Sequence, residues 1–315
     1  MPFIPTYKDV EKAHQLIQKY VHRTPVLTSK SINKITGGEI YFKCENFQKV
    51  GAFKFRGACN AVFSLPTEDA QKGVGTHSSG NHAAALALAA SMKGIDAHIV
   101  MPENSPEIKK KAVAGYGAKI TFCKPTLQAR ESTLAKVIEE SGASEIHPYN
   151  NFHVIAGQGT VAKELIEEYG EFDLIIAPVG GGGLLSGTAL STKYLLPGCK
   201  VIAAEPDGAD DAFQSFYSKT LIPSVNPKTI ADGLLTSLGE RNFKIILNKV
   251  DDIVTVTEEN IVAAMRLIWE RMKIIIEPSS AVPLAAVLEG KINITNKKVG
   301  IILSGGNMDL GKLPF

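Results

Sequence analysis

One lysine stands out in the sequence because of the residues on either side of it. Lys54 lies between Phe53 and Phe55, and a glycine and an alanine precede Phe53. Lysine side chains are rarely buried unless they are paired. Burial lowers the pKa of the amine, so that the neutral form that attacks carbonyl groups becomes populated. Lys54 is therefore a candidate for forming a Schiff base, although the more common case is a helix that buries both phenylalanines while the lysine reaches solvent.

The strongest local pattern is a run of glycines between an apolar segment and a helical one. It consists of Gly180, Gly181, Gly182 and Gly183, followed by Leu184. Consecutive glycines allow successive backbone N–H groups to turn toward one point, and the helix that follows directs its N-terminus to the same point. The run predicts a binding site for an anion, a phosphate in particular, with a flexible turn as the alternative. It matches neither the dinucleotide fingerprint nor the Walker loop.

Two further polar turns follow expected strands. The first contains Ser78, Ser79, Asn81 and His82, whose hydroxyl, amide and backbone N–H groups could bind a carboxylate. The alternative is an N-cap by one of the serines, with a capping or packing role for His82. The second turn contains Ser304, and an ordinary loop explains it as well.

Carboxylates are concentrated in the segment 205–211. Glu205 and Asp211 have the spacing of oxygen ligands for a hard cation. The segment lacks the twelve-residue pattern of an EF-hand loop, so spacing alone favours a solvated acidic loop.

Short apolar stretches alternate with longer helical patterns along the chain, which predicts parallel sheets covered by helices. The expected strands span 40–42, 73–76, 97–101, 118–122, 144–147, 174–177, 201–204 and 299–303, and the segment from 205 to 250 is expected to be less regular. We therefore expect an α/β protein with two open parallel-sheet domains. The large domain would comprise 1–72 and 149–315, and a small mobile domain would comprise 73–148. In such folds ligands bind at the carboxyl ends of the strands, here in the cleft between the domains.

The composition excludes several classes of function. The 315 residues include 34 basic and 32 acidic ones, for a net charge of +2, so neither nucleic acid nor an anionic membrane is an expected partner. The four cysteines are scattered without a C-x-x-C pair, which is typical of reduced thiols. The N-terminus lacks the pattern of a signal peptide. We expect a soluble, cytoplasmic globular protein.

A desolvated lysine, an anion site and polar strand ends are together what pyridoxal phosphate requires of a protein. The sequence resembles the fold-type II pyridoxal-phosphate enzymes, in the branch of serine racemases and serine/threonine dehydratases. The matching stretches are 52–58, 78–82, 155–160, 180–183, 229–233, 269–273 and 303–307, in family order. The resemblance implies a tryptophan synthase β-like fold, pyridoxal 5'-phosphate as cofactor, and a homodimer.

The resemblance implies a role for each motif. Lys54 would carry the cofactor as a Schiff base and move the proton on one face of the substrate, while Ser79 would act as acid or base on the opposite face. Asn81 would bind the cofactor's 3-hydroxyl, the glycines and the Leu184 N–H would bind its phosphate, and Ser304 would contact its pyridine nitrogen. The residues expected to bind the substrate are Ser78, Ser79, Asn81 and His82.

Two further sites follow from the resemblance. Glu205, the carbonyl of Ala209 and Asp211 would bind Mg2+ or Ca2+. The contacts of ATP, as an activator, would come from Lys109, Tyr116 and Lys273. Val50 stands where a nucleotide-contacting threonine is common, and Tyr149 replaces a polar residue near the cofactor.

The implied activity is conversion of L-serine or L-threonine to a 2-oxo acid and ammonia, with racemisation of L-serine to D-serine as a parallel reaction. A neutral serine at position 304 favours prompt loss of the β-hydroxyl. One alternative is a 3-hydroxyaspartate dehydratase, in which Arg130 would bind the second carboxylate. The non-enzymatic alternative is a protein that binds a phosphorylated metabolite through the glycine run alone.

Overall fold

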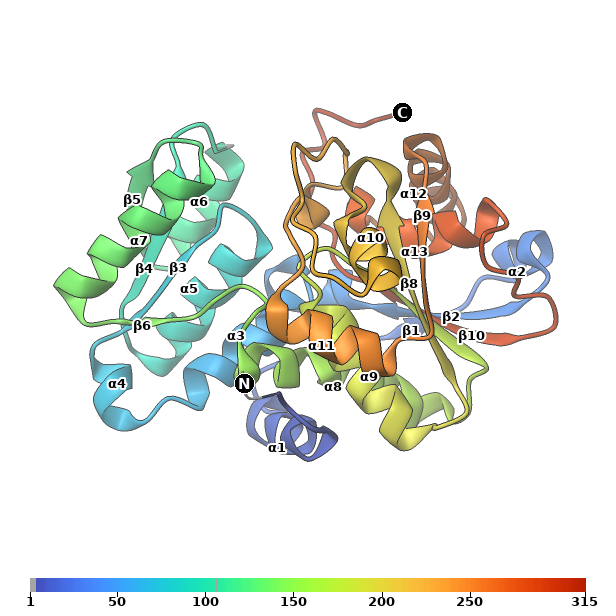
Figure 1. The fold of residues 1–315 in the computed structure, drawn as a ribbon, viewed down its shortest axis with the longest axis horizontal. Helices are drawn as coiled ribbons and strands as arrows, with labels where there is room; N and C mark the ends of the chain where they lie inside the picture. The colour runs from blue at the N-terminus through green and yellow to red at the C-terminus, as the bar shows by residue number, and fades with distance from the viewer. Residues whose placement is uncertain (1–3, 106) are drawn as a thin grey trace.

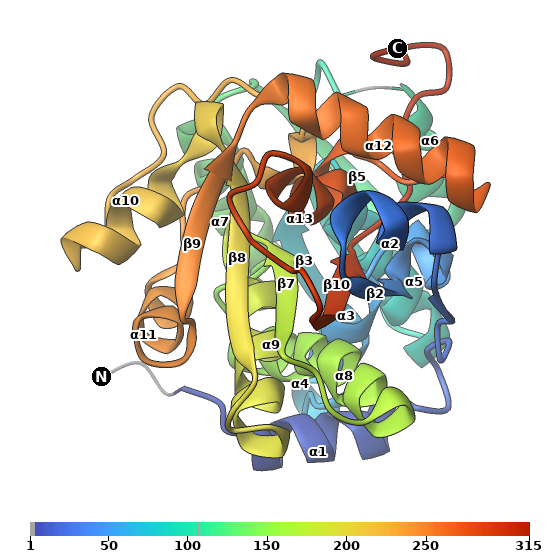
Figure 2. The same ribbon diagram turned by 90° about the vertical axis from the view of Figure 1, so that its right-hand side faces the viewer.

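The computed structural model describes residues 4–105 and 107–315, and its strands form two separate sheets (Figures 1 and 2). The larger sheet has the order β1 (Val26–Leu27), β2 (Glu39–Cys44), β10 (Lys298–Leu303), β7 (Leu174–Pro178), β8 (Lys200–Pro206) and β9 (Asp252–Val256). The smaller sheet has the order β5 (Lys119–Cys123), β4 (Ala97–Pro102), β3 (Val74–His77) and β6 (Ser144–Glu145). Neighbouring strands are parallel except for β1, which pairs antiparallel with β2. The predicted α/β fold is confirmed, with an antiparallel edge strand added.

Helices cover both faces of the larger sheet, with α8 and α9 on one side and α12 and α13 on the other (Figure 1). The helices are α1 (Tyr7–Ile17), α2 (Lys30–Thr36), α3 (Lys54–Phe63), α4 (Thr67–Gln71), α5 (Asn81–Lys93), α6 (Glu107–Gly115), α7 (Leu127–Ser141), α8 (Phe152–Tyr169), α9 (Gly183–Leu195), α10 (Asp211–Ser218), α11 (Glu240–Lys249), α12 (Glu258–Met272) and α13 (Pro278–Leu288). The smaller sheet carries α5, α6 and α7 and lies beside the larger one (Figure 1). The domain boundaries inferred from the sequence remain a prediction. Among the described residues, no helix combines the length and the apolar character needed to cross a membrane.

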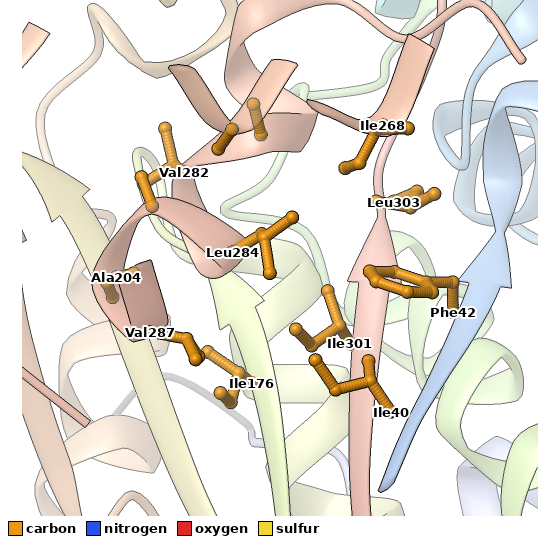
Figure 3. Packing of buried hydrophobic residues seen from close by; sticks show 14 of the residues in the cluster. Ile40, Phe42, Ile176, Ala204, Ile268, Val282, Leu284, Val287, Ile301 and Leu303 are labelled. Atoms are coloured by element: carbon orange, nitrogen blue, oxygen red, sulfur yellow. The ribbon is translucent and has the colours of Figure 1, made fainter. Parts of the chain in front are cut away.

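Burial on both faces explains why the central strands are continuously apolar. On β10, Ile301 and Leu303 pack into the cluster on the side of α13, while Ile302 packs into the cluster on the opposite face. Figure 3 shows how the first cluster combines strands and helices. Its labelled members are Ile40 and Phe42 of β2, Ile176 of β7, Ala204 of β8, Ile301 and Leu303 of β10, Ile268 of α12, and Val282, Leu284 and Val287 of α13.

The segment up to residue 250, expected to be less regular, lacks helices and strands over 219–239 apart from the 3-10 turn Asp232–Leu234. The sequence analysis missed the helices on either side of this stretch, α10 and α11, and strand β9, which follows them. The two helices are short, with 8 and 10 residues, and helices of this length depend on tertiary packing rather than on local propensity. Strand β9 is likewise stabilised by its parallel pairing with β8, far away in the sequence.

Helix α3, which begins at Lys54, is held by a buried cluster of charges. The guanidinium of Arg56 pairs with Glu45 at 2.7 Å and with Glu164 of α8 at 2.7 Å, and Glu164 also pairs with Lys43 of β2 at 2.8 Å. All four side chains are buried. Burial opposes the charge on Glu164, but Arg56 and Lys43 outweigh it and lower the pKa of this carboxyl to about 2. The cluster therefore joins β2, α3 and α8 through buried ion pairs.

Helices α3 and α8 also approach each other closely through glycines. A Cβ atom on Gly157 of α8 would lie 2.7 Å from the Cα of Gly57 on α3, and a Cβ atom on Gly57 would overlap Gln158. Only glycine permits this approach of two backbones. The close approach and the charge cluster together determine the position of the first turn of α3.

We predict that Arg56→Met lowers the free energy of unfolding by about 3–5 kcal/mol, because two buried carboxylates lose their main partner. Urea denaturation of the apoprotein measures the change. Arg23→Met is the matched control, since Arg23 pairs with Glu168 at the surface and such pairs contribute about 1 kcal/mol or less. Equal losses in the two variants would contradict the role assigned to the cluster.

Candidate active site

Lys54 lies where α3 begins, next to the carboxyl end of β10. The preceding residue, Phe53, donates its N–H to the carbonyl of Ser304 at 3.0 Å, and Ala52 forms a bridge with Gly305. The Lys54 amine donates to the carbonyl of Pro148 at 3.1 Å. Burial lowers the pKa of Lys54 to about 8, and the carboxylate of Glu277 opposes this shift only in part. Lys54 is half-buried, and the lowered pKa has the direction expected from the sequence.

The glycine run forms a buried turn between β7 and α9. Gly180, Gly181 and Gly182 donate none of their backbone N–H groups to a partner within the described part of the chain. A Cβ atom on Gly181 would overlap the ring of Tyr149, and Gly182 has φ 86°. Buried N–H groups are almost always paired, so several unpaired ones in one turn indicate an external acceptor, as an anion site requires.

The serine turn does not cap α5 as the alternative from the sequence assumed. The N-cap of α5 is Gly80, without a side-chain cap. The hydroxyl of Ser78 instead accepts the Gly80 N–H at 3.3 Å within the turn. The N-cap alternative is therefore wrong, and Ser79 is not occupied by capping.

Asn81 and His82 begin α5 and face different partners. The Asn81 amide donates to both carboxylate oxygens of Glu277, at 3.0 and 3.1 Å, and accepts from Asn307 at 2.9 Å. The buried His82 ring has its Nε2 3.0 Å from the carbonyl of Ile146, and its Nδ1 has no partner within the described chain. Burial lowers the pKa of His82 to about 3, so the ring is neutral and Nε2 is the donor. The side chain of His82 then has no second N–H to offer a carboxylate.

Glu277 is a site residue that the sequence did not reveal. It lies directly before α13, is buried, and also accepts the N–H of Asn307 at 3.1 Å. Burial, and next the charge of Asp232, raise its pKa to about 7. A glutamate before a proline at a helix start is a common local pattern. Its contact with Asn81 depends on the approach of the two sheets, which no local signal reports.

Ser304 ends β10 in a buried position beside α13. Its hydroxyl lies 3.1 Å from that of Ser280, which donates to the carbonyl of Gly305 at 2.6 Å. Ser280 is a second residue missed from the sequence. The carbonyl of Ser304 also accepts the N–H of Phe53. Since Phe53 directly precedes Lys54, this hydrogen bond fixes the backbone of Ser304 next to the start of α3.

The two carboxylates of the acidic segment are buried rather than solvated. Glu205 and Asp211 are 0% and 3% exposed. Glu205 accepts from the backbone of α10, and one oxygen of Asp211 accepts the Leu238 N–H at 2.8 Å while the other has no partner among the described residues. Burial, and next the charge of Asp211, raise the pKa of Glu205 well above its usual value, and burial raises the pKa of Asp211 to about 6. The solvated-loop alternative is therefore wrong for these two groups, and a bound cation would relieve their repulsion.

Arg130, on α7, lies near the end of β3. Its Nε contacts the carbonyl of Thr126 at 3.4 Å. Burial lowers the pKa of His77, and the positive charge of Arg130 lowers it further. The same charge opposes the rise in the pKa of Tyr149 that burial causes. The charge of Arg130 therefore influences the pKa values of two residues, His77 and Tyr149.

The structure does not bring all expected nucleotide contacts together. A pocket of about 400 Å3 is lined by Lys273, Phe47 and Asn307 among others. Lys109 instead pairs with Asp232 at 2.5 Å, and Tyr116 packs against an apolar cluster. Neither of these two residues lines the pocket.

The sequence and the fold are similar to those of known proteins. Residues 17–305 match the family model of pyridoxal-phosphate dependent enzymes. The chain is 54% identical over 312 residues to the serine racemase of Dictyostelium discoideum, covering 98% of this chain and 96% of the relative. It is 50% identical over 313 residues to the beta-hydroxyaspartate dehydratase of Paracoccus denitrificans (strain Pd 1222), covering 99% of each. The crystal structure of a T.th. threonine deaminase is similar with a TM-score of 0.92 at 42% identity, covering 97% of this chain and 99% of that one.

The chain belongs to the family of pyridoxal-phosphate-dependent enzymes. The predicted family and cofactor are confirmed, and the non-enzymatic alternative is set aside. The unpaired N–H groups of the glycine turn suit the cofactor's phosphate, and the desolvated amine of Lys54 suits its aldehyde.

We predict that Lys54 of the apoenzyme reacts with pyridoxal phosphate at a rate that rises with pH around a midpoint near 8, because burial holds its pKa there rather than at 10.5. Stopped-flow absorbance measures the rate, with Nα-acetyl-lysine as the control for titration of the reagent. Glu277→Gln should lower the midpoint, since the Glu277 carboxylate raises the pKa of Lys54. A midpoint near 10.5 in the wild-type protein would contradict desolvation of this amine.

Proposed function

We propose that this enzyme converts L-serine and L-threonine to 2-oxo acids and ammonia, and that it also racemises serine. The observation that carries the proposal is that the protein has both a lysine with a lowered pKa and a serine hydroxyl that is not used to cap a helix. Lys54 has a pKa lowered to about 8, and Ser79 has no capping role in α5. The similarity to a serine racemase and to a threonine deaminase supports the same chemistry.

The proposal gives each residue a role in proton movement or binding. When bound, pyridoxal phosphate supplies an electron sink for the α-carbon of the substrate. Lys54 takes the α-proton from one face, and Ser79 exchanges a proton on the opposite face. Asn81 binds the cofactor's 3-hydroxyl, with Glu277 holding its amide. Ser304 contacts the pyridine nitrogen as a neutral hydroxyl, which favours loss of the β-hydroxyl.

The substrate carboxylate is expected at the start of α5. Ser78, Ser79 and Asn81 offer hydroxyl and amide groups there, and the helix N-terminus favours a negative charge. His82 belongs to this site through its backbone N–H only, since its ring donates to Ile146. The phosphate is expected on Gly180, Gly181, Gly182, Gly183 and the N–H of Leu184.

A second candidate substrate is 3-hydroxyaspartate. Arg130 on α7 favours it, because its charge adds to the fall in the pKa of His77 at the end of β3 that burial causes, although the neighbouring Glu131 opposes this effect. A cation there suits a carboxylate on the substrate's β-carbon. The similarity to a beta-hydroxyaspartate dehydratase supports this candidate. Product analysis with 3-hydroxyaspartate, L-serine, D-serine and L-threonine ranks the two candidates.

The experiment that tests the proposal compares Ser79→Ala with the wild-type holoenzyme on L-serine. Racemisation should fall about tenfold more than elimination, because only racemisation requires a proton on the Ser79 face. Chiral chromatography measures D-serine, and a coupled assay measures the 2-oxo acid. Ser78→Ala is the neighbouring control, with both activities expected to fall together. Equal losses in Ser79→Ala, or no 2-oxo acid from any of the four amino acids, would contradict the proposal.

A divalent cation, Mg2+ or Ca2+, is part of the proposal. Glu205, the carbonyl of Ala209 and Asp211 would bind it with oxygen ligands, as both ions prefer. The two buried carboxylates with raised pKa values support this assignment. Among the described residues no group of three or more His, Cys, Asp or Glu side chains forms a cation site, so the carbonyl would be an essential ligand.

We predict that a chelator lowers the melting temperature and that Mg2+ restores it, because the cation neutralises two buried carboxylates. In the chelated protein the raised pKa of Asp211 makes stability fall as the pH rises from 3.8 to about 6, and Mg2+ should weaken this fall. Differential scanning fluorimetry measures both effects. Glu205→Gln is the control, and it should lose the response to Mg2+. A wild-type protein that is indifferent to chelator at every pH would contradict the site.

The proposal has three further parts. ATP regulates the enzyme, the enzyme is a homodimer, and it is located in the cytoplasm. The pocket lined by Lys273 and Asn307 supports a nucleotide effector, since Asn307 also donates to Asn81. Lys109 and Tyr116 lie outside this pocket, and their contact with a nucleotide stays a prediction from the family resemblance. The homodimer is expected from the family alone. The four buried, unpaired cysteines agree with a reducing compartment.

A further inference from the structure

Asn242 is a buried residue that connects the glycine turn to the segment beside Lys54. It lies in the first turn of α11, which packs beside α9 (Figure 1). Its amide nitrogen donates to the carbonyl of Gly181 at 2.6 Å and to the carbonyl of Tyr149 at 3.1 Å. The side chain is 0% exposed. Because both partners are carbonyls, the amide group must present its nitrogen to them.

The hydrogen bond to Gly181 determines the direction of the next backbone N–H. In a trans peptide the carbonyl of one residue and the N–H of the following residue point in opposite directions. The Gly181 carbonyl points to α11, where it also accepts the N–H of Gly239 at 3.2 Å. The N–H of Gly182 therefore points away from α11, and it has no partner within the described chain.

Such a peptide needs a constraint because glycines on both sides permit it to rotate. Gly182 has φ 86°, a conformation in which glycine is tolerated without strain. A Cβ atom there would lie 2.8 Å from the Cβ of Asn242, so the side chain of Asn242 also fills the space beside it. Rotation of the peptide would leave a buried carbonyl without a donor, which is costly.

The second hydrogen bond connects the turn to the lysine. Tyr149 follows Pro148, whose carbonyl accepts the Lys54 amine at 3.1 Å. The ring of Tyr149 lies against Gly181, and the neighbouring Asn150 accepts the N–H of Arg241 at 3.1 Å. The first turn of α11 thus holds both the glycine turn and the segment that contacts Lys54.

We infer that Asn242 is a positioning residue for the cofactor's phosphate. Asn242 holds the Gly181–Gly182 peptide so that the N–H of Gly182 is directed toward the phosphate before the cofactor binds. The inference rests on the proposed assignment of the glycine turn to the phosphate. It predicts that loss of the amide weakens binding of ligands that carry a phosphate and leaves binding of the same ligand without phosphate nearly unchanged.

The test compares Asn242→Leu, which retains most of the volume, with Asn248→Leu as the matched control. Asn248 lies on the same helix, is exposed, and donates to the carbonyl of Lys244. The dissociation constants of the apoenzyme for pyridoxal phosphate and for pyridoxal are measured by fluorescence titration. Inorganic phosphate is titrated as a competitor of pyridoxal phosphate. For Asn242→Leu we expect about tenfold weaker binding of pyridoxal phosphate, similarly weaker competition by phosphate, and less than about a twofold change for pyridoxal.

The outcomes separate this inference from the proposed function. Unchanged affinity for pyridoxal phosphate, or equal losses for both ligands, overturns the positioning role of Asn242 and leaves the glycine turn as the phosphate site. If inorganic phosphate does not compete even in the wild-type apoenzyme, the phosphate site itself is wrong and the inference falls with it. Circular dichroism checks folding, and Asn242→Ala repeats the comparison if the leucine variant does not fold. Asn248→Leu should match the wild type in every measurement.

Discussion

The active site depends on a buried group of four charged side chains at the start of α3. Arg56 is held by Glu45 and Glu164, and Lys43 completes the cluster. Such a group costs much desolvation free energy, and removing one member leaves others uncompensated. What the cluster provides is a defined position for α3, since it joins this helix to β2 and α8. Lys54 begins the same helix, two residues before Arg56, so a rigid helix start holds the amine in a desolvated position.

Around that amine the site uses groups with little net charge. His82 is neutral because burial lowers its pKa, and burial raises the pKa of Glu277 to about 7. The glycine turn offers backbone N–H groups rather than lysine or arginine side chains. With the proposed assignments, an anionic cofactor and an anionic substrate carboxylate would meet oriented dipoles in a poorly solvated environment, where such dipoles act strongly.

The sequence predicted those features that depend on local pattern. The continuously apolar strands, the glycine turn between β7 and α9, and Lys54 between two phenylalanines each occupy a few adjacent residues. Features that depend on distant contacts were missed. Glu277 meets Asn81 across 196 residues, and Arg56 meets Glu164 across 108. Asn242 lies on α11, a short helix in a segment expected to be less regular. The predicted N-cap by a serine was wrong for the opposite reason. The local pattern is a common one, but the turn places Gly80 at the N-cap of α5 instead.

We propose that Lys54 is the residue to which the cofactor is covalently attached. The most direct measurement of this attachment is reduction of the holoenzyme with borohydride, followed by peptide mass spectrometry, in the wild-type protein and in Lys54→Arg. We expect a pyridoxyl-phosphate adduct on the peptide that contains Lys54, and no adduct on any peptide of the variant. An adduct on a different lysine of the wild-type protein, or an undiminished adduct in the variant, would contradict it.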